Sequence, residues 1–113
     1  MKPVIIHAEA ELELWHAVSF YENRVSGLGL DFETETGRIL AEIQETPKRY
    51  PKVKHGARRS LMRRFPYSVY YIELPEDIWI VAFAHTSRKP YYWLSRTKEQ
   101  ATSSPTEQGA TRK

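Results

Sequence analysis

The sequence contains no cysteine and no long hydrophobic run, and each absence excludes a class of protein. Without cysteine there are no disulfides and no thiolate metal ligands, a composition that fits a reducing compartment. The longest apolar run, residues 78–84, is far shorter than the roughly 20 residues that a membrane-spanning helix requires. No positively charged segment followed by an apolar one opens the chain as a secretory signal would. We therefore expect a cytoplasmic protein that has no membrane partner.

Motifs for metals and nucleotides are missing as well. The four histidines have none of the paired spacings of zinc sites, and there is neither a GxGxxG fingerprint nor a P-loop. A serine nucleophile would need a histidine base, and Ser68 or Ser87 near His85 lacks the sharp-turn motif of serine hydrolases. The sequence therefore predicts no metal site and no cofactor.

Acidic residues are absent from residues 46–72, although this segment holds eight lysines and arginines. Residues 1–45 contain three basic and nine acidic side chains, a net charge of −6, whereas residues 46–113 contain fourteen and five, a net charge of +9. A positive field of this kind favours binding to polyanions, meaning nucleic acid or an acidic protein segment. The alternative is a solvated basic face without a partner.

Length and apolar spacing predict a single domain over residues 1–96, followed by a disordered tail over residues 97–113. A chain of 113 residues is long enough for one core, and the tail has no aromatic residue and almost no apolar residue except alanine. A short β-prone run at residues 4–6 opens the domain. The acidic alternation that follows permits a continued strand, but an apolar stripe favours a helix. The stripe consists of Ala10, Leu14, Ala17, Val18, Tyr21 and Val25.

A second helix is expected over residues 29–46, and Pro47 ends it. Gly27 between the helices is suited to a left-handed cap. Gly37 inside the second helix costs about 1 kcal/mol relative to alanine, so we expect it to mark a close helix crossing. The two stripes predict an antiparallel helical hairpin that needs a sheet to cover it, with its acidic outer faces exposed to solvent. The second stripe consists of Phe32, Thr36, Ile39, Leu40 and Ile43.

Three strands are expected after an exposed basic loop at residues 47–57. They cover residues 58–65, 67–74 and 78–85. The last strand lacks polar alternation, which predicts a central position with both faces buried. The tyrosines of the middle strand are expected to pack in the core. The fold class is therefore α+β with the order β-α-α-β-β-β, an antiparallel meander sheet packed against a helical hairpin.

Reactive side chains gather directly after the last strand. His85, Arg88 and Tyr92 are expected at the rim of the sheet because Pro90 ends the strand, and Arg64 is expected beside them. Such a cluster has the chemistry to cleave RNA without a metal, since a histidine or tyrosine takes the 2′-hydroxyl proton and arginines stabilise the charge on phosphorus. The alternative is structural: the histidine caps the strand, the arginine forms a surface ion pair, and the aromatic residues close the core.

Further basic and aromatic side chains on the loop and at the strand ends are candidates for binding a target or nucleic acid. None of them is expected to ligate a metal. These candidates are Lys52, Lys54, Arg58, Arg59, Arg63, Tyr91 and Trp93.

The chain resembles the RelE/ParE superfamily, the toxins of type II toxin–antitoxin systems that are also called plasmid stabilisation proteins. The resemblance covers residues 4–96 and rests on the order and spacing of several short motifs. It implies a strand, a helical hairpin and a three-stranded meander, and it implies a cognate antitoxin as the protein partner. The motifs are the spacing from Ala10 to Glu22, Gly27-Leu28-Gly29 before Phe32, Pro47 followed by Tyr50-Pro51, Arg64-Phe65-Pro66-Tyr67 with Tyr70-Tyr71, and His85-x-x-Arg88-x-Pro90-x-Tyr92-Trp93.

Two target classes exist in this superfamily, so the resemblance leaves the target open. RelE-like members cut mRNA in the ribosomal A site, and ParE-like members poison DNA gyrase. Arg88 and Tyr92 match the nuclease pattern, but Ser68 stands where nuclease members carry an arginine in the middle strand. The missing arginine and the prominent hairpin favour a ParE-like gyrase inhibitor over a RelE-like, metal-independent endoribonuclease. A third alternative is a non-toxic basic module that binds nucleic acid.

Overall fold

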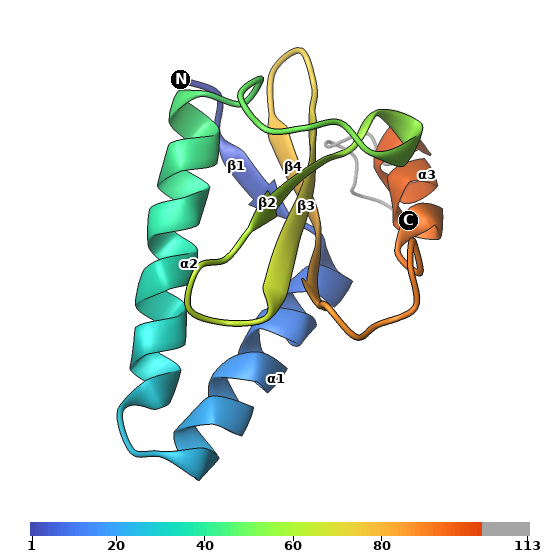
Figure 1. Ribbon diagram of the computed structural model, residues 1–113. Helices are drawn as coiled ribbons and strands as arrows, with labels where there is room; N and C mark the ends of the chain where they lie inside the picture. Colours follow the sequence, from blue (N-terminus) through green and yellow to red (C-terminus); the bar gives the residue numbers. More distant parts are fainter. Residues whose placement is uncertain (103–113) are drawn as a thin grey trace.

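The computed structural model describes residues 1–102 and arranges them as a four-stranded sheet between a helical hairpin and a third helix (Figure 1). The order confirms the predicted α+β class, to which a short 3-10 helix, η1, and the helix α3 are additions. In chain order the elements are β1 (Val4–Ile6), α1 (Ala8–Arg24), α2 (Leu28–Glu45), η1 (Lys54–Gly56), β2 (Arg58–Leu61), β3 (Tyr67–Glu73), β4 (Ile78–His85) and α3 (Leu94–Thr102).

The sheet has the strand order β1-β4-β3-β2, so β4 lies in its interior. β2, β3 and β4 form the predicted antiparallel meander, and β1 pairs with β4 in parallel through residues 78–80 only. Residues 80–84 are all buried, as expected for a strand without polar alternation. The predicted central position of this strand is therefore confirmed.

The first meander strand is shorter than the sequence predicts. The prediction extends to residue 65, whereas β2 ends at Leu61. Beyond the strand, the backbone N–H groups of Arg63 and Arg64 donate to the carboxylate of Glu35 on α2. The chain leaves the sheet there because a side chain of the hairpin takes up the donors that strand pairing would otherwise use.

The hairpin of α1 and α2 covers one face of the sheet with the stripes that the sequence predicts. Ala10, Leu14 and Phe32 are buried in this core together with Val69 and Ile80 of the sheet. The start of α1 is capped by a buried histidine, whose Nδ1 atom accepts from the second backbone N–H of the helix at 2.9 Å. The chain then turns into α2 through a glycine with a left-handed backbone at φ +91°, as predicted.

The closest approach of the two helices lies at Gly29 and not at Gly37. A Cβ atom on Gly29 would stand 2.6 Å from the carbonyl oxygen of Val18 on α1, whereas a Cβ atom on Gly37 would meet nothing within 4 Å. The prediction for Gly37 is therefore wrong. The crossing lies beside the hairpin turn because the short connection holds the helices closest together there.

The opposite face of the sheet carries a second, smaller core beneath α3. Trp93 is 1% exposed, and its ring centroid lies 4.6 Å from that of Tyr70 on β3. Val81 and Ala82 of β4 complete this core. The disordered tail predicted from residue 97 overlaps α3, which runs to Thr102, so that part of the prediction is corrected. The rest of the tail lies outside the described residues.

Candidate functional site

A pocket of about 280 Å³ opens beside the end of β4, on the face of the sheet that carries α3. We call it the rim pocket. Ser68 forms part of its floor and pairs with Ala84 on one side and Leu61 on the other. The segment that joins β4 to α3 forms its wall. Six of the predicted site residues line this pocket, namely Arg59, His85, Arg88, Tyr91, Tyr92 and Trp93.

The floor of the rim pocket offers a hydroxyl. Ser68, which is 3% exposed, is the residue that the sequence resemblance sets against the arginine of nuclease members. Positive charge comes instead from Arg59, which pairs with Tyr70 across β2 and β3, and from Arg88 beyond β4. The pocket is thus basic at its walls and neutral at its floor.

The imidazole of His85 is held by the turn that follows β4. Its Nδ1 atom accepts a hydrogen bond from the backbone N–H of Ser87 at 3.0 Å and lies 2.8 Å from the Ser87 hydroxyl. The ring packs edge-on against Tyr67, with 5.2 Å between the centroids. Because Nδ1 is an acceptor, the neutral ring carries its proton on Nε2. In that tautomer Nε2 is the donor of the ring, and Nδ1, its acceptor, is bonded to Ser87.

The hydroxyl of Tyr92 is also engaged. It donates to the carboxylate of Glu13 on α1 at 2.6 Å. Burial, together with this carboxylate, raises the pKa of Tyr92 well above its usual value. The Arg88 guanidinium lies over the Tyr92 ring, 3.8 Å from its centroid. Tyr92 therefore orients Arg88 through its ring, while its hydroxyl is no proton acceptor at neutral pH.

Glu13 joins three parts of the molecule, so the prediction of solvated acidic helix faces is wrong at this residue. In addition to Tyr92, its carboxylate accepts from the N–H of Phe83 and from both terminal nitrogens of Arg96 on α3, all at 3.0 Å. Arg96 also donates to the carbonyl oxygen of Val81 at 2.9 Å. We call Glu13, Tyr92 and Arg96 the Glu13 cluster. Its sequence signal is the place of Glu13 at the border of the apolar stripe of α1.

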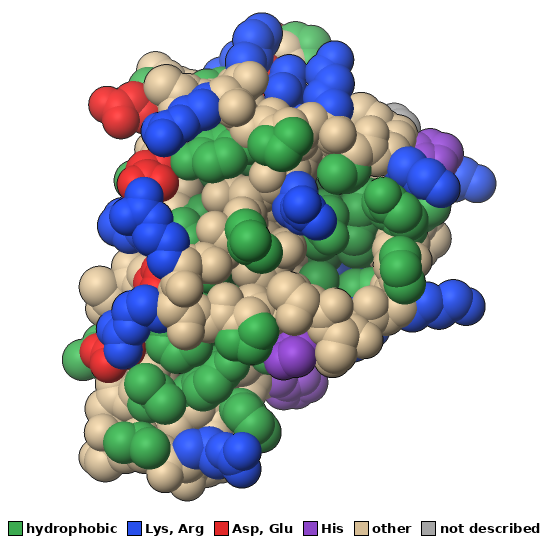
Figure 2. Space-filling view, viewed as in Figure 1, with side chains coloured by type: hydrophobic (Ala, Val, Ile, Leu, Met, Phe, Trp, Pro, Cys, Tyr) green, Lys and Arg blue, Asp and Glu red, His purple; other side chains and the backbone are tan. Residues whose placement is uncertain are grey.

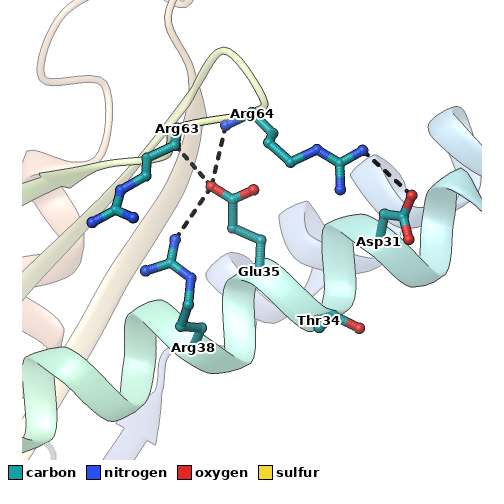
Figure 3. Close-up of a pocket in the computed structure, with 6 residues that line it drawn as sticks. All are labelled: Asp31, Thr34, Glu35, Arg38, Arg63 and Arg64. Atoms are coloured by element: carbon teal, nitrogen blue, oxygen red, sulfur yellow. Dashed lines mark hydrogen bonds and ion pairs between the residues drawn. The ribbon is translucent and has the colours of Figure 1, made fainter.

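Arg63 and Arg64 do not reach the rim pocket. They line a second pocket, of about 310 Å³, between α2 and the turn from β2 to β3 (Figure 3), which we call the corner pocket. Their backbone N–H groups donate to Glu35 at 2.7 and 3.3 Å, and the Arg64 guanidinium pairs with Asp31 at 3.4 Å. The prediction that Arg64 lies in a cluster with His85, Arg88 and Tyr92 is therefore wrong. The turn after β2 is bonded to α2, which places Arg64 in the corner pocket.

Three other residues that the sequence predicts to contact a target make contacts within the protein instead. Trp93 is buried in the second core and only borders the rim pocket, so its role is packing and the prediction that it contacts a target is corrected. The Arg58 guanidinium donates to two loop carbonyl oxygens, at 3.2 and 2.6 Å, and so holds the loop against β2. Tyr91 has a left-handed backbone at φ +60°, and the Nζ atom of Lys54 lies 4.7 Å from the centre of its ring.

Positive charge is spread over the surface around both pockets. The side chains of Lys52, Arg59, Arg63 and Arg88 are all exposed. In Figure 2 lysines and arginines occur over much of the visible face, while the acidic side chains in this view lie along its left side, over α2. The basic segment of the sequence is thus a surface feature that a polyanionic partner can reach.

The two pockets contain no constellation for metal chemistry. In residues 1–102, no three histidine, cysteine or carboxylate side chains are placed to hold a metal ion together. No helix in this part of the chain is long and apolar enough to cross a bilayer. With His85 and Tyr92 both engaged, the rim pocket combines cations with aromatic surfaces, and the chemistry it supports best is the binding of an anion.

Comparison with solved structures identifies a related fold. A chain of the structure described as "Chromosomal ParDE TA system from P. aeruginosa" matches with a TM-score of 0.65 at 17% sequence identity, over 75% of this chain and 96% of that chain. No family model and no curated protein matches the sequence. At this level of identity the likeness establishes the fold and not the activity. The chain has the RelE/ParE-like α+β fold that the sequence resemblance implies.

Proposed function

We propose that this protein is the toxin of a type II toxin–antitoxin pair. The fold likeness to a chain of a ParDE system supports the proposal. The match between the sequence motifs and the helices and strands that carry them supports it independently. The exposed basic surface supplies the counterpart that an acidic antitoxin segment needs.

Within this class we propose a ParE-like inhibitor of DNA gyrase. The observation that carries the choice is the state of the two groups that would have to accept a proton during RNA cleavage. Nδ1 of His85 is bonded to Ser87, and the hydroxyl of Tyr92 donates to Glu13. The nuclease pattern also requires an arginine in the middle strand. By the sequence resemblance this chain has Ser68 at that position, which supports the same choice. A toxin with these side chains acts by binding its target.

A gyrase assay tests the proposed target. Purified protein is incubated with gyrase and plasmid DNA, and supercoiling and trapped cleavage complexes are followed on gels. We expect supercoiling to fall and cleaved DNA to accumulate at micromolar protein, and we expect the co-purified antitoxin complex to have neither effect. Unchanged supercoiling would argue decisively against gyrase as the target.

The second candidate is a RelE-like endoribonuclease that acts on mRNA in the ribosome. Arg59 and Arg88, exposed at the rim pocket, favour it because two guanidinium groups there could stabilise a phosphate. Toeprinting of mRNA on programmed ribosomes would then show cuts in the A site that Arg88→Ala abolishes. The matched control Arg49→Ala, at an exposed arginine outside both pockets, should still cut. Absence of cuts with the unaltered protein eliminates this candidate.

Expression in cells separates both toxins from a basic module that binds nucleic acid without harm. A toxin arrests growth, and co-expression of the adjacent open reading frame relieves the arrest if that frame encodes the antitoxin. A binding module leaves growth unchanged and binds DNA or RNA with a steep dependence on salt. If the two co-expressed proteins form no stable complex, the proposal of a toxin–antitoxin pair fails.

A further inference from the structure

The corner pocket has no part in the proposed inhibition of gyrase. It lies between α2 and the turn from β2 to β3, and it shares no lining residue with the rim pocket. Figure 3 shows that Arg38, Arg63 and Arg64 surround the carboxylate of Glu35, with Asp31 beside Arg64. The partners that these charges already have within the protein decide what the pocket can bind.

Glu35 is buried and engaged within the protein through its Oε2 atom. It is 7% exposed, and its Oε2 atom accepts from the backbone N–H groups of Arg63 at 2.7 Å and Arg64 at 3.3 Å. Arg38 adds an ion pair at 3.6 Å and is itself bonded to Glu42 at 2.8 Å. Glu35 therefore fixes the backbone of the turn, and its negative charge is compensated by these donors.

The guanidinium groups of Arg63 and Arg64 remain available to a ligand. In the described part of the chain, the Arg63 guanidinium forms no hydrogen bond and no ion pair within 4.0 Å, although its charge acts on the carboxylate of Glu42. Arg64 pairs with Asp31 at 3.4 Å, and both side chains are about half exposed, a setting in which an ion pair contributes little. A carboxylate from outside can therefore bind Arg63 directly and replace Asp31 on Arg64.

The arrangement fits an extended peptide better than a nucleic acid. The two guanidinium groups point to opposite sides of Glu35 (Figure 3), which suits anions spaced along a chain and not one compact anion. β2 is an edge strand, and its Leu61 side chain, which lines the rim pocket, is 58% exposed two residues before Arg63. An apolar contact beside two arginines matches a segment that contains both acidic and apolar residues.

We propose that the corner pocket binds the acidic side chains of an extended peptide segment. One carboxylate accepts from the Arg63 guanidinium, a second replaces Asp31 on Arg64, and an apolar side chain of the segment covers Leu61. The inference rests on the proposed function and deepens it, because it names the arginines that would hold an acidic segment of the partner, whereas neither gyrase inhibition nor RNA cleavage requires them. Under the proposed function the antitoxin would supply such a segment, but the site itself is tested by direct binding.

The probe is a fluorescein-labelled peptide that alternates glutamate and leucine, and a peptide with serine in place of glutamate is its matched control. Fluorescence anisotropy with the full-length protein should show binding of the acidic peptide only. The double variant Arg63→Gln with Arg64→Gln should weaken that binding about tenfold. Arg49→Gln, which removes an exposed arginine outside the pocket, should change it less than about twofold. Because Glu35 is held by backbone N–H groups, the double variant keeps the turn, and thermal melts check this.

Asp31→Asn provides a test in the opposite direction. It frees Arg64 and should tighten peptide binding about twofold, whereas Glu33→Gln, at an exposed acid of the same helix, should leave it unchanged. Equal affinity of the double variant and the unaltered protein overturns the proposed site. If an oligothymidine displaces the peptide from the same arginines, the pocket is assigned to nucleic acid and the proposal of a peptide site is overturned. Loss of peptide binding with gyrase inhibition retained supports the inference and separates it from the proposed function.

Discussion

The carboxylate of Glu13 is bonded to α3, to β4 and to the segment between them. Its two oxygens accept from a tyrosine hydroxyl, a backbone N–H and a guanidinium, at distances of 2.6 to 3.0 Å. The side chains of Glu13 and Arg96 are 15% and 11% exposed, so water replaces little of what this residue provides. Removing one member of such a pair leaves the other charge without its partner, which costs more than the loss of an ion pair at the surface.

Glu13→Gln is expected to lower the free energy of unfolding by about 3 kcal/mol. The amide keeps one acceptor oxygen but turns an NH₂ donor towards the donors of Tyr92 and Arg96. Urea denaturation measures the change. Glu11→Gln, at an exposed acid on the same helix, is the control and should stay within about 0.5 kcal/mol. Equal losses in the two variants would show that the Glu13 cluster does not anchor these elements.

Glu73 provides a pH-dependent contribution to stability. It pairs with Lys2 and Lys48 at 2.8 Å each, and the hydrogen bonds from these lysines lower the pKa of Glu73 from 4.5 to about 2. A carboxyl whose pKa is lower in the folded state than in the unfolded state stabilises the protein fully at pH values above the unfolded pKa. This stabilisation is lost as the pH falls towards the folded pKa. When the pH is lowered from 4.5 to about 2, we expect the free energy of unfolding of the unaltered protein to fall by about 1 kcal/mol more than that of Glu73→Gln. Urea denaturation at each pH measures this difference. Parallel pH profiles of the two proteins would contradict this assignment.

At the scale of elements, two glycines of α2 are expected to respond in opposite ways to the same substitution. Gly29→Ala places a methyl group 2.6 Å from a carbonyl oxygen of α1 and should destabilise the protein by about 2 kcal/mol, because the backbones must separate. Gly37→Ala meets nothing within 4 Å and should stabilise it by up to about 1 kcal/mol through helix propensity. Thermal or urea unfolding of the two variants measures both effects. A loss of stability in Gly37→Ala would mean that this glycine has a packing role after all.

Local periodicity is sufficient to predict the hairpin and the meander, because each of these elements repeats its pattern over many residues. The helix α3 has no such stripe: it is held by Trp93, which precedes it, and by the contact of Arg96 with Glu13, which lies 83 residues away in the chain. A contact of that separation leaves no periodic trace in the sequence. The same reason explains why a disordered tail was the expectation for residues that the structure places in a helix.

The candidate site was predicted in part for the same reason. His85, Arg88 and Tyr92 are close in sequence and follow one strand, so their gathering at the rim could be predicted from the chain alone. The end of its predicted strand places Arg64 in the same cluster, but the hydrogen bonds from the turn to Glu35 are tertiary contacts that the sequence does not show. The sequence shows which residues have reactive or charged side chains, and tertiary packing determines which pocket each of them lines.

For the whole molecule, the separation of charge along the chain becomes a separation in space. The acidic half forms the hairpin, and the basic half forms the meander and its loops. A surface of this kind attracts an acidic partner over distances of about the Debye length, roughly 10 Å at 0.1 M salt. The charge therefore acts mainly on how fast a partner arrives.

The association rate with the proposed acidic antitoxin is accordingly expected to fall about tenfold or more between about 50 and 500 mM salt. Lys52→Gln with Arg59→Gln should lower the rate at low salt about threefold, whereas Arg24→Gln in the acidic hairpin should not. Stopped-flow fluorescence follows the rate through Trp15, which is partly exposed on α1. A rate that does not depend on salt would show that electrostatic attraction plays no part in the encounter.

β1 accompanies β4 only as far as residue 80, so the second half of β4 has no neighbouring strand on that side. Arg96 and Glu13 bond the Val81 carbonyl and the Phe83 N–H there, which means that two helices from opposite faces of the sheet take the place of a strand. Without them, an interior strand of apolar residues would present open backbone groups to which other chains can add. The last helix therefore protects the open edge of β4 from aggregation. We expect a chain shortened to residue 93 to aggregate before any defect in target binding could be measured.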